Sequence, residues 1–170
     1  FTSYVWVAQE ENKEALRAAV TYLAVAVIGG LVMLMGLFMV YHELGTLTNS
    51  EILPLASTVE NKTLLYAAGV CMLVGFGAKA GAFPLHIWLP KAHPVAPAPA
   101  SALLSGILTK TGIFGILVVT SNLFLYDAAR GMLILILGTI TMFCGAFLAV
   151  FSVDLKRTLA CSSMSQIGFI

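Results

Sequence analysis

Long apolar stretches separated by short polar segments make up the whole chain. A transmembrane helix needs about 20 mainly apolar residues to cross the hydrocarbon core of a bilayer. Four stretches reach that length: residues 18–41, 64–89, 100–126 and 132–153. Two shorter ones, residues 1–8 and 159–170, are interpreted as parts of further spans. We therefore predict an all-α polytopic transmembrane helix bundle with four full spans and two partial ones, and we interpret residues 1–170 as an internal fragment of a single transmembrane domain.

The content of charged residues supports a membrane protein, because only 10% of the chain is charged and 59% is hydrophobic. A soluble domain carries about 25% charged residues. The net charge of +1 and the absence of like-charge runs give no indication of nucleic-acid binding. Polar connections at 9–17, 90–99 and 154–158 hold five basic residues, against two at 42–63 and 127–130. The positive-inside rule therefore places the first set in the cytoplasm, and we predict a multi-pass protein of the cell membrane.

Residues 90–99 contain four prolines. Proline lacks an amide hydrogen and restricts the residue before it, so we predict a stiff, extended link without helix. His93 lies in this link and is a candidate for a loop or entrance role. Trp88, just before the link, is interpreted as an anchor at the membrane interface.

The three cysteines, Cys71, Cys144 and Cys161, stand alone among apolar or small residues. They form no CxxC pair, and no histidine lies at ligand spacing from them. Cysteines in such surroundings usually behave as buried small hydrophobic residues. We therefore predict no metal site and no iron–sulfur site on this chain.

Two lysines interrupt the apolar spans, Lys79 in residues 64–89 and Lys110 in residues 100–126. Each lies about ten residues from the link at 90–99, or roughly 15 Å, near the midplane of a core about 30 Å thick. Equal distances from a shared loop predict equal depths in antiparallel helices. A lysine stem reaches only several ångströms, so snorkelling does not bring either amine to the interface. A central lysine costs about 2.5–3.5 kcal/mol to insert, which makes a functional site the first interpretation and a structural ion pair the second.

The sequence around Lys79 favours a proton relay. A buried lysine changes its protonation when a neighbouring charge moves. Small residues from Gly75 to Gly81 let another helix approach closely. Pro84 has no amide hydrogen and frees the carbonyl near Ala80, which predicts a break in this span. Broken backbone at membrane depth is tolerated where it lines a hydrated cavity or is buried in protein.

Three further side chains are candidates for support of a proton path. His86 lies two residues after Pro84 and titrates near neutrality, although a hydrogen-bonded core histidine is an equally simple interpretation. Ser105 and Thr109 precede Lys110 by about one turn and by one residue. Their hydroxyl groups either bind water or bond back to the helix backbone, and the sequence leaves both alternatives open.

At these residues the chain resembles the antiporter-like proton-channel subunits. That superfamily is shared by respiratory complex I, multi-subunit Mrp-type Na+/H+ antiporters and membrane-bound NiFe hydrogenases. The motifs are residues 77–90, 101–112 and 154–168, which resemble the broken seventh helix, the eighth helix and the ninth-to-tenth junction. The run 92–106 is more similar to hydrogenase-type members.

At three positions the chain differs from the usual residues of the family, and these differences bear on which subfamily it resembles. The family usually has Asp where this chain has Lys91 and Tyr where it has Cys161, and some members have His where it has Ser105.

The resemblance implies that Lys79 pairs with a fifth-helix glutamate just upstream of Phe1, and that Lys110 passes protons toward a second half-channel. It implies proton translocation by a subunit of a redox-driven complex, either NADH:quinone oxidoreductase-like or membrane-bound hydrogenase-like. No cofactor is expected on this chain, since flavin, iron–sulfur and NiFe centres would lie on partner subunits. Its partners would be the lipid bilayer, other membrane subunits and protons, with sodium ions as an alternative. The rival hypotheses are an Mrp-type Na+/H+ antiporter subunit and a structural helix bundle.

Overall fold

The computed structural model describes residues 2–59, 62–124 and 127–170 as a helical bundle. In chain order the helices are α1 (Thr2–Ala8), α2 (Lys13–Leu44), α3 (Asn49–Thr58), α4 (Thr63–Ala80), the short turn η1 (Leu85–Ile87), α5 (Trp88–Val95), α6 (Ala98–Leu103), the π-helical turn η2 (Leu104–Leu108), α7 (Thr109–Leu123), α8 (Ala128–Val150) and α9 (Leu155–Phe169). No strand occurs within these described ranges, so the predicted all-α fold is confirmed.

Four helical stretches are long and apolar enough to cross a membrane: Lys13–Leu44, Thr63–Val95, Ala98–Leu123 and Ala128–Val150. They confirm the prediction of a polytopic bundle with four full spans. The shorter helices α1 and α9 lie where the two partial spans are predicted. The predicted boundaries at Phe1 and at Tyr126 lie outside the described residues.

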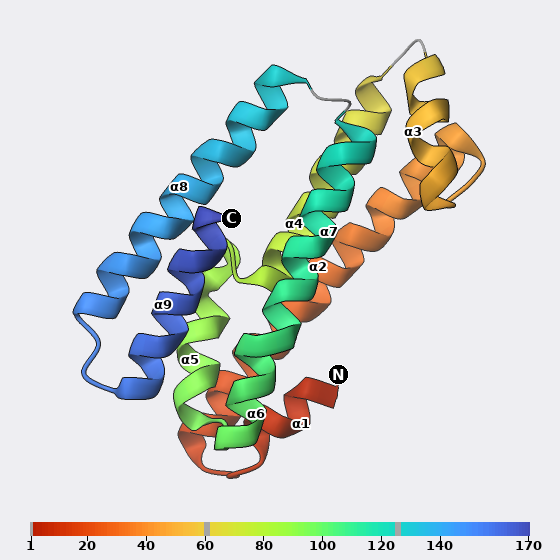
Figure 1. The fold of residues 1–170 in the computed structure, drawn as a ribbon. Helices are drawn as coiled ribbons and strands as arrows, with labels where there is room; N and C mark the ends of the chain where they lie inside the picture. The colour runs from red at the N-terminus through yellow and green to blue at the C-terminus, as the bar shows by residue number, and fades with distance from the viewer. Residues whose placement is uncertain (1, 60–61, 125–126) are drawn as a thin grey trace.

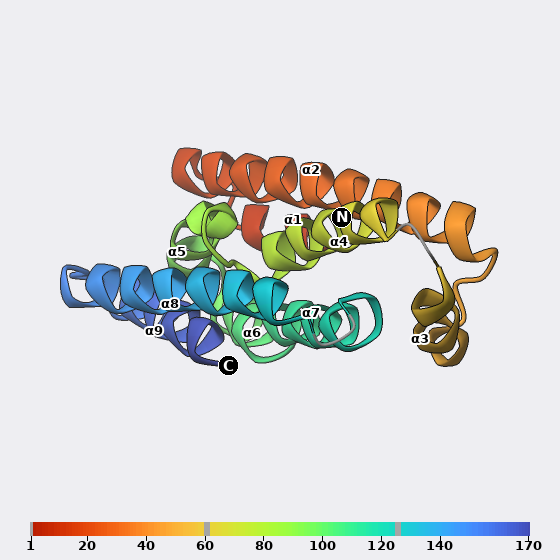
Figure 2. The ribbon, with the colours of Figure 1, turned by 90° about the horizontal axis from the view of Figure 1, so that it is seen from above.

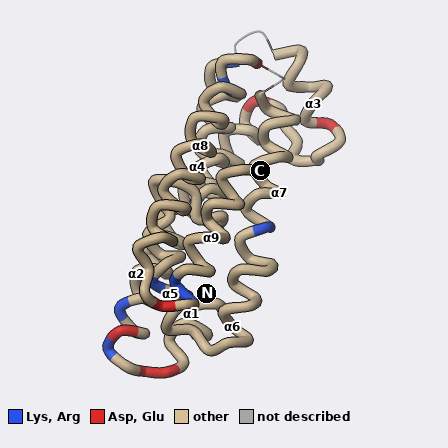
Figure 3. Tube along the Cα trace, turned by 60° about the vertical axis from the view of Figure 1, so that its left-hand side comes forward, with Lys and Arg blue, Asp and Glu red and all other residues tan. Residues whose placement is uncertain are grey.

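The spans form two groups of helices. Figure 1 shows α2, α4 and α7 side by side, with α8 and α9 as a second, antiparallel pair, and Figure 2 shows α4 between α2 and α7. Helix α5 contacts both α2 and α9 and so joins the two groups. Charged residues gather at the ends of the helices, whereas the middle of the bundle is almost free of them (Figure 3).

Small residues allow α4 to touch both of its neighbours closely. A Cβ atom at Gly29 of α2 would lie 2.6 Å from the Cβ of Ala78. A Cβ atom at Gly112 of α7 would lie 2.6 Å from the backbone nitrogen of Ala80. Such contacts are typical of membrane bundles, in which small residues let helix backbones approach. The small residues of α4 therefore allow close packing on two of its faces, one against α2 and one against α7.

The predicted extended link at 90–99 is wrong for most of its length. Helix α5 runs through Pro90 and Pro94, and α6 begins at Ala98, so the interruption lies at Ala96 and Pro97. Pro90 is tolerated because amide hydrogens in the first turn of a helix have no helical acceptor. Pro94 is the next-to-last residue of α5, so the distortion it causes coincides with the end of the helix.

Candidate functional site

The span that contains Lys79 is broken between Ala80 and Leu85. Gly81 takes the left-handed conformation, with φ of 78°, and the amides of Gly81 and Ala82 both donate to the carbonyl oxygen of Gly77 at 2.9 Å. A residue without a Cβ adopts this conformation at little cost, which is why glycine so often ends a helix. The prediction of a break at Pro84 is confirmed.

Two backbone groups at the break form hydrogen bonds with side chains of other helices. The indole Nε1 of Trp88 donates to the carbonyl oxygen of Ala78 at 2.8 Å. The amide of Phe83 donates to the hydroxyl oxygen of Thr141 on α8 at 3.0 Å. In an apolar environment an unpaired backbone group is costly, so these bonds stabilise the broken conformation.

Trp88 is not an interfacial anchor. Its side chain is only 2% exposed and packs edge-to-face on Tyr22, with ring centroids 5.0 Å apart. The indole N–H satisfies the carbonyl oxygen of Ala78, while the large apolar ring packs against apolar neighbours. The interpretation from sequence is therefore wrong for Trp88.

Lys79 lies half-buried in the last turn of α4, without a partner inside the described chain. On this helix Gly75 and Ala78 face α2, while Phe76 and Ala80 face α7. With a turn of about 100° per residue, Lys79 points from the side of α4 that lies between these two faces. Among the described residues, neither of the two ion pairs involves Lys79, and no hydrogen bond satisfies its amine.

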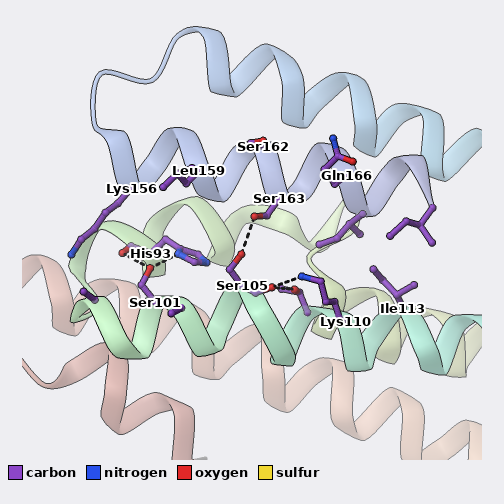
Figure 4. A pocket seen from close by; sticks show the side chains of 15 residues that line it. His93, Ser101, Ser105, Lys110, Ile113, Lys156, Leu159, Ser162, Ser163 and Gln166 are labelled. Carbon is purple, nitrogen blue, oxygen red and sulfur yellow. Dashed lines mark hydrogen bonds between the residues drawn. The ribbon is translucent and has the colours of Figure 1, made fainter.

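Lys110 has hydrogen-bonding partners within the chain. Its Nζ and the hydroxyl of Thr109 both donate to the carbonyl oxygen of Ser105, each at 3.0 Å. The Ser105 hydroxyl lies 2.9 Å from that of Ser163 on α9 (Figure 4). Ser105 belongs to the π-helical turn η2, and such turns occur frequently at functional sites. Thr109 thus makes the bond back to the helix that was one of the two alternatives, whereas the Ser105 hydroxyl bonds to another helix, which was neither of them. A role for Ser105 or Thr109 in a proton path stays a prediction.

A cavity of about 620 Å³ lies between α9 and the segment that runs from α5 to α7. Lys110 lines it, and so do other polar residues. These are His93, Ser101, Ser105, Thr109, Lys156, Ser162, Ser163 and Gln166. Figure 4 shows Ser105 and Lys110 along one wall and Ser163 along the other, and no Asp or Glu of the described chain lines the cavity. Its lining is completed by apolar side chains such as Ile113 and Leu159, and Lys110 itself is exposed. The cavity is therefore an open, partly polar space with a basic character at the side of the described bundle.

His93 lies in helix α5 and not in a loop, so that part of its prediction is wrong; its entrance role stays a prediction. The side chain is 3% exposed, and its Nδ1 lies 2.5 Å from the Ser101 hydroxyl. Its Nε2 is buried without a partner among the described residues. Lys156 ties the start of α9 to this region, because its Nζ donates to the carbonyl oxygen of Ala96 at 3.0 Å. His93 thus joins the cavity of Lys110.

His86 joins neither lysine. It stacks on Phe83 with ring centroids 5.8 Å apart, and its Nδ1 is buried without a partner in the described part of the chain. It does not line the cavity of Lys110. A role for His86 in a proton path therefore stays a prediction.

The two lysines lie at similar levels but on different faces of the helices. Gly112 touches α4 at Phe76 and Ala80, so Lys110 and Lys79 lie within about one helical turn of the same level. Gly112 and Gly115 face α4, which turns Lys110 to the opposite side of α7. The amines therefore lie in separate surroundings, the side of α4 between its contacts with α2 and α7 for Lys79 and the cavity beside α9 for Lys110.

Sequence reasoning missed Thr141, Ser101 and Ser163, whose partners lie on other elements of the fold. The role of Trp88 could have been predicted from sequence, because its indole N–H follows a predicted break that frees backbone carbonyl groups. Among the described residues, no group of three or more His, Cys, Asp or Glu side chains is placed to hold a metal ion.

The fold is a multi-pass membrane bundle with ionisable side chains at the depth of the apolar core, an arrangement typical of membrane proteins that move ions. A family model for the transmembrane region of NADH:quinone oxidoreductase and Mrp antiporter subunits matches residues 2–170. The chain belongs to this family.

Its relatives include both redox and antiporter proteins. It is 35% identical over 172 residues to hydrogenase-4 component B of Escherichia coli (strain K12), covering 99% of this chain and 25% of that protein. It is 34% identical over 169 residues to a Na(+)/H(+) antiporter subunit of Alkalihalophilus pseudofirmus, covering 99% of this chain and 34% of that protein. The chain thus spans about a quarter to a third of the length of these curated relatives.

Two solved structures share the fold. An archaeal membrane-bound sulfane sulfur reductase complex contains a chain that is 26% identical with a TM-score of 0.85, covering 98% of this chain and 34% of that one. The Mrp complex from Dietzia sp. DQ12-45-1b contains one that is 26% identical with a TM-score of 0.84, covering 92% and 29%.

Proposed function

We propose that this chain translocates protons across the membrane as part of a subunit of a redox-driven, multi-subunit complex. The observation that carries the proposal is the place of the Lys110 amine, which is exposed at the depth of the apolar span and lines an open cavity with hydroxyl groups on both walls. A cavity of about 620 Å³ is large enough for several water molecules, each of which occupies about 30 Å³ in the liquid. Water, hydroxyl groups and a lysine together form a chain of groups that can hand on protons.

Lys79 is proposed as the second proton-carrying group. It has no acidic partner among the described residues, and it lies on the side of α4 between the contacts with α2 and with α7. Figure 2 shows α1 beneath α2, and α1 contacts α2 and α5. This supports the expectation, drawn from the family resemblance, that a glutamate upstream of Phe1 pairs with Lys79.

Electrons are proposed to be handled by partner subunits. The chain shows no flavin, iron–sulfur or NiFe motif in its sequence. Hydrogenase-4 component B is named as one component of a larger hydrogenase. The proposed partners of this chain are therefore the lipid bilayer and other membrane subunits, at least one of which leads to redox centres.

The second candidate function is Na+/H+ antiport as a subunit of an Mrp-type complex. The similarity to a Na(+)/H(+) antiporter subunit and to a chain of a solved Mrp complex favours it. Inside-out vesicles that carry the full-length protein in its complex separate the two functions. Proton uptake on addition of an electron donor supports the redox-driven complex, whereas uptake that requires only a sodium gradient supports the antiporter.

The same vesicles test whether Lys79 carries protons at all. We expect Lys79→Ala to lower proton transport per assembled complex by about 100-fold, the usual weight of a proton-transferring group. Lys91→Ala is the matched control, since it removes an exposed lysine from the same broken span. Transport near the wild-type rate in Lys79→Ala, with normal assembly, would leave the structural helix bundle as the better interpretation.

A further inference from the structure

Helix α8 presents one narrow face to the rest of the bundle. Of its 23 residues, all of them described, only Thr141 and Gly145 are buried. A Cβ atom at Gly138 would lie 2.9 Å from the carbonyl oxygen of Gly168, and one at Gly145 would lie 2.5 Å from the nitrogen of Ser165. Gly138, Thr141 and Gly145 are spaced to share one helix face, so the close packing on α9 fixes the position of the Thr141 hydroxyl.

The hydroxyl of Thr141 is both a hydrogen-bond donor and a hydrogen-bond acceptor. It donates to the carbonyl oxygen of Leu137 at 2.7 Å and accepts the Phe83 amide at 3.0 Å. Thr139, two residues earlier, makes the same internal bond to Leu135 at 2.7 Å but is exposed. A hydroxyl that has already given its hydrogen to the helix backbone still offers an oxygen lone pair. In Thr141 this lone pair accepts the amide hydrogen of Phe83 at the break.

The acceptor matters because of where the Phe83 amide would otherwise bond. In a continuous α-helix the amide of residue 83 donates to the carbonyl oxygen four residues earlier, which is that of Lys79. The bond to Thr141 therefore replaces the bond that would continue the helix through Lys79. On the other side of the break, Trp88 occupies the carbonyl of Ala78, the acceptor that residue 82 would use. Each half of the break is held open by a side chain.

Water does not readily take over the role of Thr141. The threonine and Phe83 line a groove of about 570 Å³ between α4, α7, α8 and α9. Apart from hydroxyl groups, the side chains that line it are apolar. An amide that loses its acceptor in such a place gains no equivalent partner.

We propose that Thr141 is a positioning residue for proton translocation: it keeps the span of Lys79 broken by taking the amide that would rebuild the helix. The proposal rests on the proposed function, because the purpose of the open break is to place Lys79. The hydroxyl acts through the backbone and not on the proton itself. It is a link between α8 and Lys79 that connects residues 58 positions apart.

The experiment uses the full-length protein in its complex with Thr141→Val, which keeps the shape and removes the hydroxyl. Thr141→Ser restores the hydroxyl, and Thr139→Val is the control on the same helix. Two quantities are measured: hydrogen–deuterium exchange of the peptide that contains Phe83, and proton transport per assembled complex in vesicles. We expect Thr141→Val to speed exchange at this amide and to slow transport, each by about tenfold, as loss of one buried hydrogen bond implies. Thr141→Ser should return both to within about twofold, and Thr139→Val should change neither.

Wild-type transport in Thr141→Val would overturn the proposal, whatever the exchange shows. Equal impairment of Thr141→Ser and Thr141→Val would also overturn it, since the hydroxyl would then not be the cause. If Thr141→Val does not assemble, Thr141→Ala decides, because it removes the hydroxyl without adding bulk. Lys79→Ala, measured in parallel, separates the positioning role of Thr141 from the proposed function. If Lys79→Ala loses transport and Thr141→Val keeps it, the positioning role is rejected and the proposed function is retained.

Discussion

The surroundings of Lys79 and of Lys110 differ although the two lysines lie at similar levels of neighbouring helices. Around Lys79 the helices are in close contact, with small residues of α4 touching Gly29 of α2 and Gly112 of α7. Around Lys110 the opposite face of α7 opens into a cavity with hydroxyl groups on both walls. One lysine lies at a tightly packed junction of helices and the other beside a polar space.

The difference shows which partners each lysine finds within the described chain. The Lys110 amine bonds to the carbonyl oxygen of Ser105, and the serines nearby extend the polar contacts to α9. The Lys79 amine has no such bond among the described residues.

The largest difference is expected when each lysine is replaced alone. Lys110→Ala should slow proton transport by about tenfold, whereas Lys79→Ala should slow it by about 100-fold. The open cavity gives water access to take over part of the role proposed for Lys110, whereas the close contacts of α4 with α2 and α7 leave less space around Lys79. Proton uptake by vesicles, normalised to assembled complex, measures both. Equal losses in the two variants would remove the distinction between the sites.

A smaller effect is expected from adding one methyl group to either face of the α6–α7 span. Gly112→Ala should destabilise the bundle by about 1–3 kcal/mol, because its Cβ meets backbone atoms of α4 that cannot move aside. Gly106→Ala meets nothing within 4 Å and should be neutral or slightly stabilising, since alanine favours helix. Thermal unfolding of the purified protein gives both values. A destabilised Gly106→Ala would mean that the open side is filled in the full-length protein.

The smallest effect is expected at the link between Ser105 and Ser163. Ser163→Ala should slow transport about two- to threefold, the usual weight of one hydrogen bond that water can replace. Ser162→Ala is the control, because Ser162 lines the same cavity and is exposed. An effect of Ser162→Ala as large as that of Ser163→Ala would show that the cavity responds to lost polarity in general and not to this bond.

The spans, the break and the two lysine positions could be predicted because each depends on a local pattern. An apolar run of about 20 residues needs no knowledge of its neighbours to be recognised as a span. The break follows from Gly81 and Pro84, which act within four residues of each other. The similar depth of the lysines follows from counting residues to a shared connection.

The partners of the break could not be predicted, because they come from distant positions. Thr141 looks like any other threonine in an apolar helix, and only the packing of α8 on α9 brings it to Phe83. The proline-rich link was mispredicted for a different reason. Pro90, Pro97 and Pro99 fall in or just before the first turn of a helix, where the missing amide hydrogen costs little, and Pro94 lies where α5 ends anyway. Composition alone does not reveal that placement.

The length of α2 has a consequence for how the whole bundle sits in lipid. Its uncharged part, residues 18–41, extends about 36 Å at 1.5 Å per residue, and the hydrocarbon thickness of a bilayer is about 30 Å. Matching the two requires a tilt of roughly 30° from the bilayer normal or a locally thickened membrane. Since α4 is packed on α2 through glycine and alanine, any tilt of α2 is transmitted to the broken span. Membranes of different thickness would then change the orientation of the lysine side chains without altering a single residue.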